Sequence, residues 1–180
     1  MDNIAAWFFR VVRTRLIIVM SALYLIFSLY LLPKIINTGN VGPLDLLFWY
    51  NHNTLYMMFS SYGEAIRNIY KIGLLTADVI YPIFYGTLLA MIIALVQKKL
   101  TIPFSRRIIF IPFVAVFFDF IENALLVFLL NIYPNKNMLV ADIAGYVTAT
   151  KWCAFGIIPP LIIYLIIYGI RNRKRKSQNQ

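Results

Sequence analysis

The stretch Ile108–Ile132, with the sequence IIFIPFVAVFFDFIENALLVFLLNI, decides the fold of this chain. At about 1.5 Å of rise per residue, a helix of this length crosses the roughly 30 Å hydrocarbon core of a bilayer. Its only charged residues, Asp119 and Glu122, lie near the middle. We therefore predict a membrane-spanning helix that carries two carboxylates into the apolar layer.

Three other apolar segments also have the length of a membrane span, at residues 16–32, 72–96 and 152–169. The chain is 61% hydrophobic and 13% charged, whereas soluble domains are about 45–50% apolar and about 25% charged. These features predict an all-α, polytopic membrane protein with four transmembrane helices in a bundle. Residues 1–170 form the single membrane domain in this prediction, and residues 171–180 form a basic cytoplasmic tail.

The distribution of positive charge predicts the orientation in the membrane. Twelve of the 17 Lys and Arg residues lie before the first span, between the second and third spans, and in the tail. The positive-inside rule then places both termini in the cytoplasm, which agrees with an even number of spans. The same clusters, which give a net charge of +10, are expected to contact anionic lipid headgroups rather than nucleic acid.

The connection from Pro33 to Lys71 is too apolar for an ordinary loop. Its leucines and aromatic residues recur at roughly helical spacing, which predicts one or two short helices in the outer membrane interface. Asn53 and Thr54 are the expected cap of the second of these helices. The sequence contains no Asn-X-Ser/Thr sequon and no C-terminal KDEL-type signal, so the plasma membrane is the default location.

The candidate site begins with Asp119, Glu122 and Asn123, whose spacing places them on one face of the third span. A charged side chain at the centre of a span costs about 2.5–3.5 kcal/mol on the insertion scale. Such residues persist where they face a bundle interior, a water-filled cavity or a partner. This face is therefore expected to point into the bundle.

The second span offers a matching face with Asp78, Tyr81, Pro82 and Tyr85. Pro82 cannot donate to the carbonyl of Asp78, four residues earlier, so this acceptor is free for a cation or a water molecule. Lys151, near the outer end of the fourth span, is the basic residue expected to reach the carboxylates. The resulting prediction is an acidic binding pocket formed by Asp78, Tyr81, Tyr85, Asp119, Glu122, Asn123 and Lys151.

Three interpretations of this pocket remain open. It binds a proton, a cation or a cationic amphiphile, as in a small transporter or binding protein, for which a homodimer is expected. Alternatively, the protein is a lipid-modifying membrane enzyme with Asp119 or Glu122 as acid and base. In the third, the protein is an accessory membrane protein whose polar groups only hold helices together, at about 0.6 kcal/mol per hydrogen bond.

Cofactor chemistry finds little support in the sequence. The chain has one histidine, His52, and one cysteine, Cys153, which excludes a zinc site built from several Cys and His ligands. Motifs for nucleotide binding, zinc proteases and nucleophile elbows are absent from the sequence. We expect no cofactor and no metal.

The predicted architecture resembles the sterol-isomerase-like four-span proteins, which place acidic residues and an asparagine among their helices. The stretch Asp119-Phe120-Ile121-Glu122-Asn123 does not match that family's motif residue by residue. The resemblance concerns the architecture alone and assigns no role to any residue.

Overall fold

The structure is a computed structural model that describes residues 2–36 and 38–178. It confirms the predicted all-α membrane architecture, with four helical segments long and apolar enough to span a bilayer. The elements are α1 (Asp2–Val11), α2 (Thr14–Ile26), η1 (Phe27–Leu31), α3 (Leu32–Ile35), η2 (Gly39–Val41), η3 (Leu44–Leu46), α4 (His52–Leu75), α5 (Ala77–Leu100), η4 (Arg106–Phe110), α6 (Pro112–Ile132), α7 (Met138–Gly156) and α8 (Ile158–Gln178).

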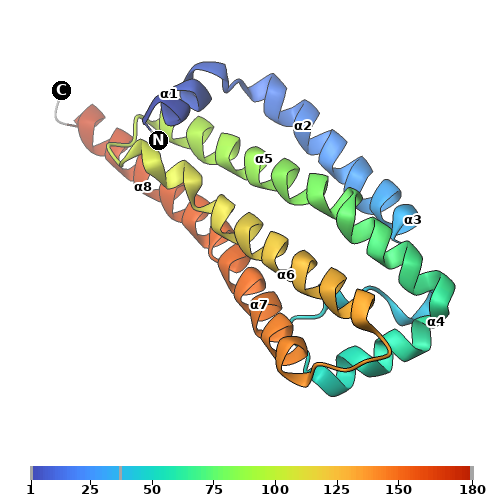
Figure 1. Cartoon of the computed structure of the whole chain (residues 1–180). Helices are drawn as coiled ribbons and strands as arrows, with labels where there is room; N and C mark the ends of the chain where they lie inside the picture. Colours follow the sequence, from blue (N-terminus) through green and yellow to red (C-terminus); the bar gives the residue numbers. More distant parts are fainter. Residues whose placement is uncertain (1, 37, 179–180) are drawn as a thin grey trace.

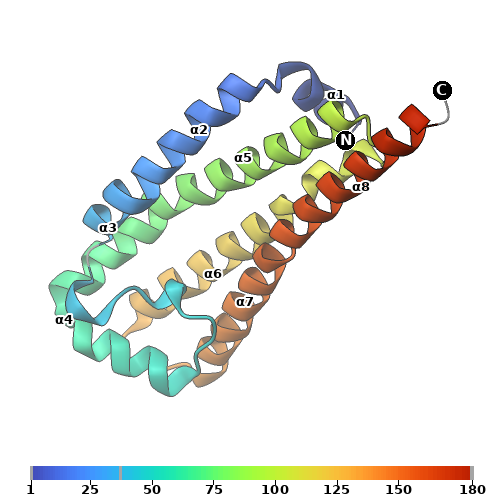
Figure 2. The same cartoon turned by 180° about the vertical axis from the view of Figure 1, so that it is seen from behind.

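Helices α2, α5, α6 and α7 follow one another across the bundle (Figure 1), and α8, which continues α7, packs mainly on α5. Span one, defined here as Thr14–Ile35, runs through α2, η1 and α3. It packs mainly on α5, which also contacts α6 and α8. The chain end of α8, helix α1 and the connection from α5 to α6 share one end of the bundle, which we call the basic end (Figures 1 and 2).

The four helical segments, each of which can join several elements, extend beyond the apolar segments that predicted them. The fourth helical segment begins at Met138 rather than at 152, and its two helices meet at Ile157, just before Pro159 and Pro160. Hydropathy marks where lipid contact is favourable, whereas a helix continues until its backbone is capped. The basic tail continues α8 as far as Gln178, and residues 179–180 of the predicted tail lie outside the described residues.

The long first connection folds against the far end of the bundle. In Figure 2 its residues cross in front of α6, from the end of α3 to the start of α4 beside α7. The cap of α4 is Asn51, whose side chain accepts from the Thr54 backbone N–H at 3.0 Å. The expected cap at Asn53 and Thr54 was therefore placed two residues too late. Gly63, with φ of 67°, kinks α4 where a side chain would be strained.

Helix α1, where the sequence analysis predicts no element, covers the basic end of the bundle. Its residues Ala5 and Phe8 are buried among residues of α5, η4 and α8. The Arg107 guanidinium donates to both carboxylate oxygens of Asp2, at 3.0 Å each. This bidentate pair holds the pKa of Asp2 below its usual range. Helix α1 is therefore fixed both by apolar packing and by an exposed ion pair.

The buried carboxylates of α5 and α6 lie between two clusters of buried apolar side chains. One cluster, at the far end, includes Leu55, Phe59 and Leu126. The other, at the basic end, includes Ile93 and Leu165. The carboxylates of α5 and α6 lie between these clusters along the spans, so the fold concentrates its buried charge at one level of the bundle.

Gly145 in α7 packs closely against the backbone of the first connection at Tyr50. An added Cβ at this position would lie 1.8 Å from the Tyr50 carbonyl oxygen. We expect Gly145→Ala to displace the connection and to destabilise the protein by about 1–3 kcal/mol, because tightly packed sites resist added volume. Thermal unfolding in detergent measures the loss. Gly156→Ala is the matched control, since an added Cβ there meets no atom within 4 Å; equal stability of the two variants would contradict the described packing.

Candidate functional site

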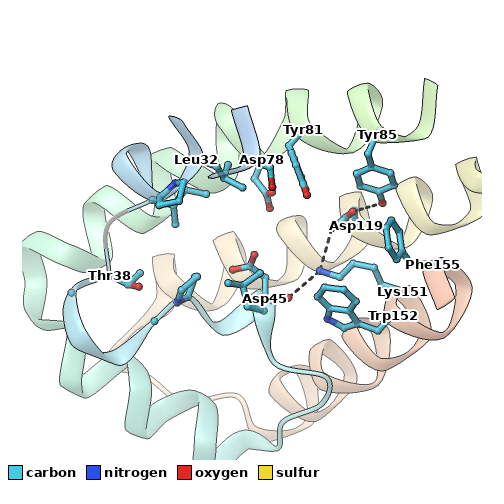
Figure 3. Close-up of a pocket in the computed structure, with 17 residues that line it drawn as sticks. Leu32, Thr38, Asp45, Asp78, Tyr81, Tyr85, Asp119, Lys151, Trp152 and Phe155 are labelled. Atoms are coloured by element: carbon cyan, nitrogen blue, oxygen red, sulfur yellow. Dashed lines mark hydrogen bonds and ion pairs between the residues drawn. The ribbon is translucent and has the colours of Figure 1, made fainter. Parts of the chain in front are cut away.

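The candidate site is a cavity of about 380 Å³ among span one, the first connection, α5, α6 and α7. Its charged and tyrosine side chains come from four elements and are Asp45, Asp78, Tyr81, Tyr85, Asp119 and Lys151. Figure 3 shows these side chains converging on the cavity. Most of its other lining residues are apolar and come from span one, the first connection and α7.

Lys151 links the polar walls of the cavity. Its ammonium lies 3.2 Å from Asp119 Oδ1 and 2.5 Å from Glu122 Oε2. It also donates to the backbone carbonyl of Asp45 at 3.2 Å. These three acceptors match the three N–H donors of an ammonium group. Because Lys151 is only 7% exposed, the carboxylates rather than water compensate its charge.

Hydroxyl groups donate to the carboxylate oxygens of Asp119 and Glu122 that do not contact Lys151. Tyr85 in α5 donates to Asp119 Oδ2 at 2.6 Å. On the other side, the Thr148 hydroxyl donates to Glu122 Oε1 and forms a 3.2 Å hydrogen bond with the Tyr50 hydroxyl. Glu122 is fully buried behind Lys151 and does not line the cavity. One hydrogen-bonded network thus joins α5, α6 and α7.

The backbone carbonyl of Asp78, which Pro82 was expected to leave free for a cation or a water molecule, has a protein partner instead. Pro82 has no N–H to donate to the carbonyl of Asp78, and the Asn123 side-chain amide donates to this carbonyl at 2.9 Å instead. The carbonyl is therefore satisfied by protein rather than left for a cation or water. Asn123 takes part in the site by holding α5 to α6, behind the cavity wall.

The Asp78 side chain lacks such compensation. It is 4% exposed, and its Oδ2 atom is buried with no hydrogen-bond partner among the described residues. Burying a charged oxygen without a partner is unfavourable by several kcal/mol. Figure 3 shows the carboxylates of Asp78 and Asp45 on opposite sides of the cavity, pointing toward one another.

Asp45 is the site residue that the sequence analysis missed. It lies in η3, is 8% exposed, and accepts a 2.7 Å hydrogen bond from the Tyr70 hydroxyl at Oδ1. A carboxylate inside the apolar run Leu44–Tyr50 was a signal in the sequence. No helical spacing relates this residue to the spans, however, so only the folded connection brings it to Lys151.

The cavity region therefore holds more acids than bases. Asp45, Asp78, Asp119 and Glu122 surround a single ammonium group, and each ionised carboxylate beyond the first adds uncompensated negative charge. Within the described residues, no three His, Cys, Asp or Glu side chains are arranged to hold a metal ion. Chemically, such a site attracts positive charge or retains protons.

In three comparisons with known proteins, no family model, no curated protein and no solved structure matched this chain. Any function proposed for the cavity therefore rests on its own geometry and charge.

Removing the Lys151 ammonium tests whether the network is held by charge. We expect Lys151→Gln to lower stability by about 3–5 kcal/mol at neutral pH, because Asp119 and Glu122 then lack their buried counter-ion. Part of the loss should return as the pH is lowered, since a protonated carboxyl group is less unfavourable to bury than a carboxylate. Unfolding of the purified protein in mixed micelles, followed by circular dichroism, measures both effects.

Lys71→Gln is the matched control, because the Lys71 ammonium makes an exposed hydrogen bond to Asn131 at 3.2 Å. This change should alter stability by less than about 0.5 kcal/mol. A Lys151→Gln protein as stable as the Lys71→Gln protein at every pH would contradict the buried ion-pair network.

Proposed function

We propose that this protein binds a cationic amphiphile, an organic cation with an apolar body, in its membrane-embedded acidic cavity. The observation that carries the proposal is the unpartnered, buried Oδ2 atom of Asp78. Its carboxylate faces that of Asp45 across the cavity (Figure 3). A ligand ammonium between them would supply the missing hydrogen bonds and the missing positive charge.

The shape and lining of the cavity support an organic cation over a bare ion. A volume of about 380 Å³ falls within the range of about 300–1,000 Å³ for ligand pockets. Leu32, Ile36 and Phe155 contribute apolar wall around the carboxylates. The rings of Tyr81 and Trp152 add aromatic surface, on which cations bind favourably. Such a site suits a binding protein or a small transporter. If the protein is a transporter, we expect it to be a homodimer.

An enzymatic role for Asp119 and Glu122 has less support. Both carboxylates are engaged by Lys151, and their remaining oxygens accept from Tyr85 and Thr148. A general acid or base needs an accessible proton position within reach of the substrate. Asp78 has the free oxygen that those two carboxylates lack, which favours ligand binding at Asp78.

The proposal includes the orientation of the protein in the membrane. The basic end carries Arg10, Lys98, Arg107 and Arg171 among its charged residues, so we place it in the cytoplasm with both termini. There it would contact anionic headgroups of the plasma membrane. The cavity then lies toward the outer leaflet.

Binding of 2-phenylethylamine to the protein in phosphatidylcholine nanodiscs, followed by calorimetry, tests the ligand class. We expect Asp78→Asn to weaken binding about ten- to hundred-fold, because a charge-assisted hydrogen bond contributes about 1.5–3 kcal/mol. The neutral analogue 2-phenylethanol should bind at least about ten-fold more weakly than the amine.

Glu64→Gln serves as the control, since it removes an exposed carboxylate away from the cavity. Its affinity for the amine should equal that of the wild type. If the amine fails to bind, or binds equally to the wild type and the Asp78→Asn variant, the proposed function is wrong and the structural interpretation of the polar groups gains support.

The orientation has a separate test in cells that express Cys153→Ala with one new cysteine. Asn135→Cys lies in the connection from α6 to α7, and Lys99→Cys lies near the basic end. A membrane-impermeant maleimide should label the first variant in intact cells and the second only after permeabilisation. The opposite labelling pattern would reverse the proposed topology.

A further inference from the structure

We propose that the bound cation is the head of a single-chain alkylamine, whose tail leaves the cavity sideways between span one and α7 into the bilayer. This inference rests on the proposed function, and it names both the class of amphiphile and the route by which it reaches the cavity.

Span one and α7 form two side walls of the cavity, and no polar interaction joins these two walls among the described residues. Ser28 and Leu32 of span one and Trp152 and Phe155 of α7 line it, and all four are only partly buried. Among the described residues, no hydrogen bond, ion pair or aromatic contact links span one to α7. Apolar side chains can therefore separate there without breaking a polar interaction.

Span one is instead attached to the opposite neighbour, α5. The Tyr24 and Tyr81 hydroxyls lie 2.7 Å apart, and their rings stack at 5.7 Å. Phe27 also stacks with Tyr81, with ring centroids 6.1 Å apart. The most apolar window of span one has no buried residue. This span is thus held along one edge, and we place the lateral opening of the cavity at its other edge, toward α7.

The opening lies at the depth of the hydrocarbon core. Ser28 follows Arg15 by 13 residues, and Phe155 precedes Arg171 by 16 residues. At about 1.5 Å of rise per residue, the two residues lie roughly 20 and 24 Å from the basic end. The hydrocarbon core is about 30 Å thick. Both rims of the opening therefore face acyl chains rather than water.

A change of helix type occurs at the same rim. The five residues Phe27–Leu31 form the π-helix η1 within span one, and Ser28 of this segment lines the cavity. A π-helical turn shifts the facing of the residues around it, and such turns occur frequently at functional sites. Here it turns a small polar side chain toward the cavity at the edge of the opening.

Volume and charge narrow the ligand to one chemical class. The cavity of about 380 Å³ is at the small end of known ligand pockets, so it suits an amine head and the first part of a chain. The rest of a long chain would extend through the apolar opening. The surplus of carboxylates repels phosphate, which disfavours phospholipids that carry an amine. A single-chain amine without phosphate satisfies both constraints.

Photocrosslinking of the full chain in phosphatidylcholine nanodiscs tests this inference. The probe is a C12 alkylamine that carries a diazirine at the end of its chain. We expect mass spectrometry to locate the crosslinks on residues 25–35 and 149–163, which border the opening. Excess 2-phenylethylamine should remove these crosslinks by occupying the acidic cavity.

Two variants and two probes make the result specific. Asp78→Asn should reduce crosslinking at these sites at least about ten-fold, as should Asp45→Asn, and size-exclusion profiles equal to the wild type would show that both fold. A C12 alcohol and a C12 lysophosphatidylethanolamine with the same diazirine should give no crosslink that the compact amine removes.

The failure of this inference can be told apart from that of the proposed function. Crosslinks spread evenly over the lipid-facing helices and insensitive to 2-phenylethylamine would overturn the lateral route, while the compact amine could still bind at Asp78. Competed crosslinking by the lysophospholipid, equal to that by the amine, would overturn the assigned head group. If the compact amine itself does not bind, both proposals fail together.

Discussion

The ion-pair network around Lys151 is the interaction on which the rest of this structure depends. One ammonium group satisfies Asp119 and Glu122 of α6 and the carbonyl of Asp45 in the first connection. Unpaired charges are strongly unfavourable in a low-dielectric region, so each of these groups requires the others. The network therefore fixes the position of α6 relative to α7 and holds the connection over the cavity.

The network compensates some of the buried carboxylates and leaves one without a partner. The two α6 carboxylates are compensated by Lys151 and by hydroxyl groups, whereas Asp78 keeps one buried oxygen without a partner. A bundle that needed polar groups only for helix packing would gain stability by satisfying this oxygen. The unsatisfied carboxylate and the apolar side walls together favour a ligand that is both cationic and apolar.

The periodicity of the spans predicted Asp78, Tyr81, Tyr85 and Asp119, four of the polar residues that line the cavity. Asp78, Tyr81 and Tyr85 share one helix face because their spacing is helical, and the same argument applies to Asp119 and Glu122. Spacing along one helix does not determine which polar groups of different helices become hydrogen-bond or ion-pair partners. The freed carbonyl of Asp78 was predictable from Pro82, but its partner proved to be the Asn123 amide. That choice depends on the rotation of α6 against α5.

The amino-acid sequence by itself determined the solvent and the architecture, because long apolar segments are stable only in lipid and a helix satisfies its own backbone there. It also placed carboxylates within the apolar segments. Only the tertiary structure decided that Asp45 joins them, that Glu122 lies behind Lys151, and that residues of span one, the first connection and α7 line the same cavity. The physical reason is that these features depend on how helices pack and how an irregular connection folds back, and neither follows a local sequence period.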